Sequence, residues 1–149
     1  EAARAGVKLL RERGATMLIH LGDVGSEAVL DELVGVEAHV VFGNCDYDDD
    51  SLTRYAELMG ITVHHPLGRL EVDGRRLAFT HGHVQHLLEF ALRQGADYVL
   101  HGHTHVRRDE RCEGRRVINP GALHRASPLS VALLDPARDT LEFLDVPSH

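Results

Sequence analysis

Residues 101–105 read His-Gly-His-Thr-His and follow a short run, Asp97 to Leu100, that is typical of a strand. Alternate residues of an extended segment point to the same side, so we expect His103 and His105 to direct their imidazoles at one point. Gly102 would let the backbone turn sharply and leave room for a neighbouring group. This segment constrains the chain more than any other, because it predicts a strand that ends at metal ligands.

Three other segments carry oxygen or nitrogen donors directly after a short apolar run. They are Gly22-Asp23 after residues 17–21, Gly43-Asn44-Cys45-Asp46 after residues 39–42, and Thr80-His81-Gly82-His83 after residues 77–79. Either glycine pair alone is common turn chemistry, and a single histidine is more often a packed or surface residue than a ligand. Four donor segments, each at the end of a predicted strand, together indicate a metal centre.

Predicted strands and helices alternate along the chain. Strands are expected at 16–21, 37–42, 69–72, 75–79, around Tyr98, and at 107–112, 115–118, 129–134 and 140–145, and helices at the start of the chain and at 26–34, 51–59 and 84–94. Asp73-Gly74 predicts a two-residue hairpin turn. Helices early and hairpins late predict an α/β sandwich of two mixed β-sheets flanked by helices. In such a fold the donor segments gather at one end of the strands.

Composition fits one compact domain over residues 1–149, with 43% hydrophobic and 26% charged residues. The formal net charge of −7 argues against stable nucleic-acid binding, which usually needs a basic surface. No apolar run approaches the ~20 residues that span a membrane, and two cysteines make no disulfide framework. We therefore expect a cytoplasmic protein without membrane contact, and leave formation of a homo-oligomer open.

Taken together, the donor segments resemble the motifs of the calcineurin-like metallophosphoesterases, most closely their small bacterial and archaeal phosphodiesterase branch. That family's motifs run D-x-H, G-D, G-N-(H/C)-(D/E), H-G and G-H-x-H in chain order. The last four are matched here by Gly22-Asp23, residues 43–46, His81-Gly82 and residues 102–105, and Asn119-Pro120-Gly121 matches the turn that follows them. The resemblance covers nearly the whole chain and implies the metallophosphoesterase type of sandwich.

The resemblance also implies a ligand set and a reaction. Two divalent transition-metal ions are expected, Mn²⁺ first, with Ni²⁺, Fe²⁺ or Zn²⁺ as alternatives. Asp23 would bridge both ions, Asn44, His81 and His103 would complete the second site, and His105 would belong to the first. Hydroxide generated from water between the ions would attack a small phosphodiester, without a covalent nucleophile from the protein.

Cys45 stands where many relatives carry a histidine that contacts the phosphate or protonates the leaving group. A thiol with an ordinary pKa near 8.5 is a poorer acid than histidine, and the substitution favours substrates with good leaving groups. Cys45 is therefore our candidate catalytic residue, and the alternative is a small buried residue beside the metal site. His83 is a candidate substrate contact, and His101 a candidate hydrogen-bond donor behind the ligands.

The remaining histidines have no place in the motif pattern. We interpret them as structural or surface residues: His20, His39, His64, His65, His86, His124 and His149.

The opening D-x-H motif is absent from these 149 residues. The chain opens on a helix, since Ala3, Val7 and Leu10 recur at helical spacing and Gly14 fits the helix C-terminus. In the family this helix follows the D-x-H strand, so we expect about 15–20 further residues before it. The alternative is a protein that lacks them.

A chain without that strand should carry a groove beside the strand at 16–21, lined by Leu18 and Val40, because such strands need neighbours on both sides. Its first metal site would keep only Asp23 and His105, and it would bind one ion and hydrolyse little. The enzyme interpretation is thus conditional on an upstream D-x-H. The alternative function is a weakly active or non-catalytic scaffold, as in the retromer subunit that uses this fold to bind proteins.

Overall fold

Three sheets make up the β-structure of the computed structural model, which describes residues 2–43 and 49–147. A parallel sheet has the order β1-β2-β3, a mixed five-stranded sheet has the order β4-β5-β6-β8-β7, and β9 and β10 form an antiparallel pair. The strands are β1 (Met17–His20), β2 (Glu37–Val41), β3 (Thr62–His64), β4 (Leu67–Val72), β5 (Arg75–Thr80), β6 (Tyr98–Leu100), β7 (Arg108–Cys112), β8 (Arg115–Asn119), β9 (Leu129–Asp135) and β10 (Thr140–Val146). The helices are α1 (Ala2–Glu12), α2 (Glu27–Asp31), α3 (Asp49–Leu58) and α4 (Gln85–Arg93).

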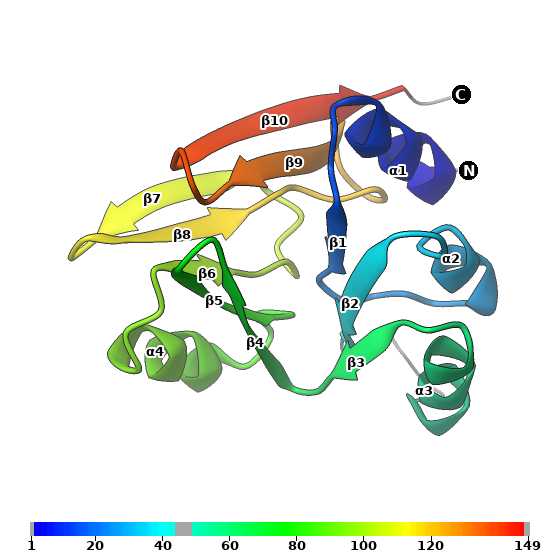
Figure 1. Cartoon of the computed structure of the whole chain (residues 1–149), viewed down its shortest axis with the longest axis horizontal. Coiled ribbons are helices and arrows are strands. Elements are labelled where there is room, and N and C mark those ends of the chain that lie inside the picture. Colours follow the sequence, from blue (N-terminus) through cyan, green and yellow to red (C-terminus); the bar gives the residue numbers. More distant parts are fainter. Residues whose placement is uncertain (1, 44–48, 148–149) are drawn as a thin grey trace.

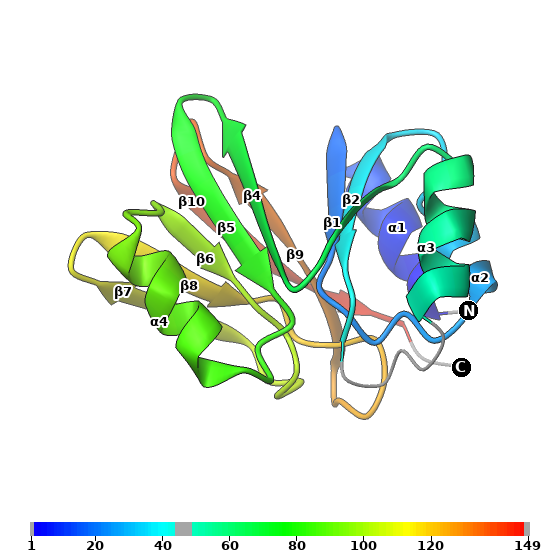
Figure 2. The same cartoon turned by 90° about the horizontal axis from the view of Figure 1, so that it is seen from below.

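The sheets are stacked between helices, as Figures 1 and 2 show. α1, α2 and α3 lie on the outer face of the parallel sheet, and α4 covers the outer face of the five-stranded sheet. α1 also packs against β9 and β10 through Ala5 and Leu9. The predicted α/β sandwich flanked by helices is confirmed, but β9 and β10 form a sheet of their own and the first sheet is purely parallel.

Successive side chains of β5 and β6 point to opposite faces of the five-stranded sheet, and both faces are covered. In β5, Leu77 and Phe79 enter the core between the two large sheets, whereas Ala78 packs against α4. In β6, Leu100 faces the same inner core and Val99 faces the helix. These strands are therefore apolar on both sides, as expected for strands between two layers.

The hairpin between β4 and β5 agrees with its sequence signature. Asp73 and Gly74 have φ values of 52° and 77°, as a type I′ turn requires at both central positions. The helix predicted at 26–34 is shorter, because turns replace it before Gly35, which has a φ of 103°. Strand β3 was not predicted, since three residues are too few to show a period.

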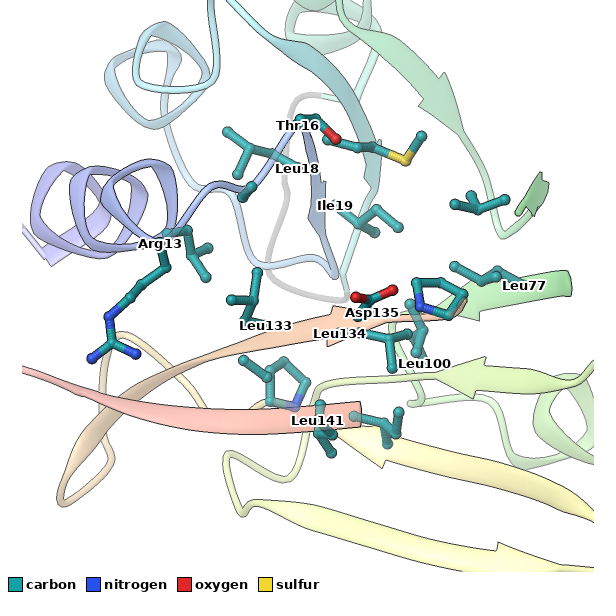
Figure 3. Close-up of a pocket in the computed structure, with 18 of the residues that line it drawn as sticks. Arg13, Thr16, Leu18, Ile19, Leu77, Leu100, Leu133, Leu134, Asp135 and Leu141 are labelled. Atoms are coloured by element: carbon teal, nitrogen blue, oxygen red, sulfur yellow. The ribbon is translucent and has the colours of Figure 1, made fainter. Parts of the chain in front are cut away.

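A groove runs beside the edge of β1 that faces β9 and β10 (Figure 3). Within the described ranges, the pairing partner of β1 is β2 alone. The groove has a volume of about 410 Å³ and is lined by Leu18 and Ile19 of β1, Leu133 and Leu134 of β9 and Leu141 of β10. Leu18 therefore lines a groove, as expected.

The expectation for Val40 was wrong. Val40 is fully buried, because its strand β2 has β1 on one side and β3 on the other. Its side chain packs in the core that the parallel sheet shares with α1, α2 and α3.

Among the described helices, none combines the length and apolar character needed to cross a membrane.

Candidate metal centre

Asp23 lies just beyond the carboxyl end of β1, in the left-handed region with a φ of 57°. Aspartate tolerates this conformation better than most residues, and such backbone strain clusters at functional sites. The loops around it approach so closely that a Cβ on Gly22 would overlap His81 Nδ1, and one on Gly43 would overlap Asp23 Oδ1. Glycine at these two positions is therefore what lets the donor segments meet.

His81 follows β5 and is 2% exposed. Its Nδ1 lies 2.7 Å from the carbonyl oxygen of Leu21. Because a carbonyl oxygen can only accept a hydrogen bond, Nδ1 carries the proton. Nε2 then presents its lone pair to the site, 3.5 Å from Asp23 Oδ1 and 3.3 Å from Nδ1 of His103. A histidine whose second nitrogen donates to a carbonyl is oriented as metal-binding histidines usually are.

His103 and His105 reach the site by a route other than the one predicted. β6 ends at Leu100, and the two histidines have φ values of 70° and 62° in the loop that follows. The alternation argument was therefore wrong for this segment, because left-handed residues and not an extended backbone direct both rings. Gly102 itself does not have a positive φ, and a Cβ there would meet its nearest neighbour, the Leu21 carbonyl oxygen, at an ordinary 3.4 Å.

Asp23 lies between the two predicted ligand groups. Its Oδ1 is 3.5 Å from Nε2 of His81, and its Oδ2 is 3.9 Å from Nε2 of His105. The carboxylate is 9% exposed. One oxygen thus faces the ligands expected for the second ion and the other faces the ligand expected for the first, which is the arrangement that a bridging carboxylate needs.

The buried side chain of Asn119 holds the histidine loop in place. Its Nδ2 donates to the Gly102 carbonyl at 3.2 Å and to Thr104 Oγ1 at 3.0 Å. His101 Nδ1 also donates to the Gly102 carbonyl, at 3.1 Å. Burial is the main cause that lowers the pKa of His101, which favours its neutral form as a hydrogen-bond donor behind the donor cluster.

Two further histidines border the donor cluster. The His83 ring centroid is 5.3 Å from that of His81, and burial followed by the charge of His81 lowers the pKa of His83. His124, which the motif pattern left unassigned, has its ring centroid 4.5 Å from that of His105. Burial, followed by the charge of His105, lowers the pKa of His124. No motif or spacing in the sequence indicates His124, because the loop that brings it here follows a different strand, β8.

Asn44 and Cys45 lie outside the described residues, so their predicted roles stay predictions. The described donors Asp23, His81, His103 and His105 offer one carboxylate and three imidazoles, a set that suits divalent transition metals. They border a cavity of about 560 Å³. The donor chemistry and the close glycine approach both fit a metal centre that opens into this cavity.

Residues 1–139 match the model of the calcineurin-like phosphoesterase superfamily domain. The chain belongs to this superfamily. It is 30% identical over 122 residues to phosphodiesterase MJ0936 of Methanocaldococcus jannaschii. The aligned residues make up 79% of this chain and 74% of that protein. It is also 30% identical over 146 residues to the probable metallophosphoesterase YsnB of Bacillus subtilis, covering 90% and 78%.

Solved structures agree with this phosphoesterase assignment. An archaeal phosphodiesterase structure superposes with a TM-score of 0.88 at 25% identity, covering 97% of this chain and 92% of that one. Vps29 of Entamoeba histolytica gives a TM-score of 0.65 at 19% identity, over 95% and 88%, and shows a shared fold. Membership supports phosphoesterase activity with divalent metals, which the donor cluster around Asp23 is suited to bind.

Proposed function

We propose that this chain is a metal-dependent phosphodiesterase that hydrolyses a small phosphodiester. The observation that carries the proposal is Asp23, whose two oxygens lie 3.5 Å and 3.9 Å from histidines of two different segments. When bound, divalent ions would activate water and neutralise the charge of the phosphate. The relative in Methanocaldococcus jannaschii that carries the name phosphodiesterase supports the choice of diester over monoester.

The chain's own residues would orient and enclose the substrate. The Leu21 carbonyl keeps the Nδ1 proton on His81, so that the lone pair of Nε2 faces the site as a potential ligand. The cavity of about 560 Å³ lies within the range of small-molecule sites. His83, whose ring centroid is 5.3 Å from that of His81, would donate a hydrogen bond to a phosphate oxygen.

The finer assignments are part of the same proposal. Two ions, with Mn²⁺ as the first choice and Ni²⁺, Fe²⁺ or Zn²⁺ as alternatives, would be held by Asp23, Asn44, His81, His103 and His105. Cys45 would lie next to the phosphate and assist departure of good leaving groups. A D-x-H segment would add ligands to the ion that Asp23 and His105 hold. A cytoplasmic location stays a prediction.

The test compares an aryl phosphodiester with the corresponding monoester, using Mn²⁺-loaded chain with and without a D-x-H segment joined upstream. We expect the diester to react faster, and the D-x-H form to be the more active. Excess chelator and Asp23→Asn should each abolish turnover, whereas His86→Gln on the exposed side of α4 should not. Equal turnover in chelator, or a preference for the monoester, would contradict the proposal.

The scaffold alternative is not favoured by the described site. The likeness to Vps29 is at 19% identity and concerns the fold alone. A binding platform has no need for a carboxylate and three histidines whose donor atoms converge, as those of Asp23, His81, His103 and His105 do. The retained donors therefore support the enzyme.

A further inference from the structure

His124 brings a third donor to the side of Asp23 that faces His105. The ligand atoms of Asp23, His105 and His124 all lie within 4.8 Å of one another. Metal–ligand bonds of 2.0–2.1 Å allow two ligand atoms on one ion to be about 4.2 Å apart at most. His105 Nε2 and Asp23 Oδ2 are 3.9 Å apart, within that limit, and a pair of donors at the 4.8 Å bound would have to close by about 0.6 Å to share one ion.

We propose that His124 is a protein ligand of the first metal ion, together with Asp23 and His105. This inference rests on the proposed function, because it concerns the same site. It adds to that site His124, which the motif pattern leaves out. Two imidazoles and one carboxylate form a three-ligand set that leaves coordination positions open for water or substrate. With His124 the first ion has three ligands from residues 23–124, without any contribution from D-x-H.

The loop that carries His124 is anchored to the loop that carries His105. Asn119 is fully buried, and its Nδ2 bonds the Gly102 carbonyl and Thr104 Oγ1 of the histidine loop. Its Oδ1 accepts a hydrogen bond of 2.9 Å from the backbone nitrogen of Gly121. One side chain therefore holds both loops in register before any ion arrives, which lowers the ordering cost of binding.

The far end of the His124 loop is anchored as well. The Ser130 backbone nitrogen donates to the Ala122 carbonyl at 2.9 Å. Gly121 has a φ of 89°, and a Cβ there would lie 2.6 Å from the Cβ of Ser130. The backbone two residues before His124 is thus held against β9, which limits where the exposed His124 side chain can lie.

The open side of this ligand group faces the substrate cavity. Asp23, His105 and His124 all line the cavity of about 560 Å³, together with His81 and His103. An ion held by the first three would present its open positions to the same space as an ion held by His81 and His103. The proposed ligand therefore lies on the reacting side of the site.

Cobalt(II) binding tests the assignment without measuring activity. The 149-residue chain is titrated with Co²⁺ and followed by calorimetry and by visible and near-ultraviolet absorption. His124→Ala should weaken binding of one ion by at least the ~10–100-fold that even outer hydrogen-bond partners of a metal are worth. His124→Cys should restore binding and add a thiolate-to-cobalt charge-transfer band.

His86→Cys is the matched control, because His86 is an exposed histidine of α4. Wild type and His86→Cys both retain Cys45 and Cys112, so only a band specific to His124→Cys counts as support. Unchanged affinity in His124→Ala, or absence of a new band in cobalt-loaded His124→Cys, would overturn the assignment. Because neither readout is turnover, a failed phosphodiesterase assay refutes the proposed reaction and leaves this result standing.

Discussion

Two polar clusters lie in different parts of the molecule and differ in how their groups are spaced. Around Arg116, Nε and Nη2 donate to the two oxygens of Asp109 at 2.7 and 2.8 Å. Around Asp23, the oxygens are 3.5 Å from His81 and 3.9 Å from His105. The first spacing is that of charge-assisted hydrogen bonds. The second leaves room for a further atom, so the comparison separates a cluster that stabilises the fold from one arranged to bind.

The pKa shifts in the arginine cluster agree with mutual stabilisation. The hydrogen bond from Arg116 lowers the pKa of Asp109. Burial, followed by the hydrogen bond to Asp139, raises the pKa of Tyr98 to about 12. The Tyr98 hydroxyl donates to Asp139 Oδ1 at 2.6 Å and so favours the charged form of that carboxylate. The groups of this cluster thus hold one another in their ordinary charge states.

The largest effect should come from removing the centre of the binding cluster. We expect the double variant Asp23→Ala, His103→Ala to lose Mn²⁺ binding, because one change removes the carboxylate proposed to bridge the ions and the other a proposed ligand of the second ion. Calorimetric titration measures it. The metal-free variant should unfold at the same temperature as the metal-free wild type or higher, since the distances from Asp23 and His103 to the neighbouring donor atoms, 3.3–3.9 Å, are longer than those of strong hydrogen bonds. Unchanged Mn²⁺ affinity in the double variant would show that the Asp23 cluster is not the metal-binding cluster.

An intermediate effect is expected from Arg116→Met in the stabilising cluster. The variant leaves Asp109 and Asp139 without their shared cation, and because these carboxylates are partly exposed we expect a loss of about 2–3 kcal/mol of unfolding free energy. Urea unfolding measures it, and Mn²⁺ affinity should not change. Arg138→Met is the control, because Arg138 is exposed and its nearest carboxylate oxygen, on Asp135, is 3.8 Å away. A similar loss in both variants would show that the Arg116 cluster has no special role.

The smallest effect is expected from Tyr98→Phe. Loss of the hydrogen bond to Asp139 should lower the Tm by about 2–4 °C at neutral pH. Because the pKa of Tyr98 is raised from 10.0 to about 12, its contribution is fully present below pH 10 and is lost as pH rises toward 12.

The difference in unfolding free energy between wild type and Tyr98→Phe should therefore shrink over that interval. Tyrosinate absorbance should show one group titrating near pH 12 in wild type and missing from the variant. An ordinary titration near pH 10 for every tyrosine would contradict this prediction.

Local sequence patterns predicted much of the fold. The Asp73-Gly74 turn was predictable because two adjacent residues with positive φ favour those residue types. The strands ending in Thr80 and Leu100 were predictable from short apolar runs. Strand β3 and the separate pairing of β9 with β10 were not, because pairing partners and very short strands depend on contacts between distant segments.

The candidate site was predicted in part and for partly mistaken reasons. His103 and His105 do reach the cluster, but through left-handed backbone conformations that the assumption of an extended segment does not contain. The sequence patterns leave His124 among the structural or surface residues, because no spacing connects it to Asp23. They indicate Asn119 only as part of a turn, although its side chain connects two loops.

By itself, the sequence determined which donors are available and that each follows a strand, because strand periods and glycine-containing turns are local properties. The tertiary structure decided which donors meet. The hydrogen bond from His81 to the Leu21 carbonyl joins residues 60 positions apart. The approach of His124 to Asp23 involves a loop that is hydrogen-bonded to β9 through Ala122 and Ser130. Such long-range contacts follow from how sheets and helices bury their apolar faces, and no short stretch of sequence encodes them.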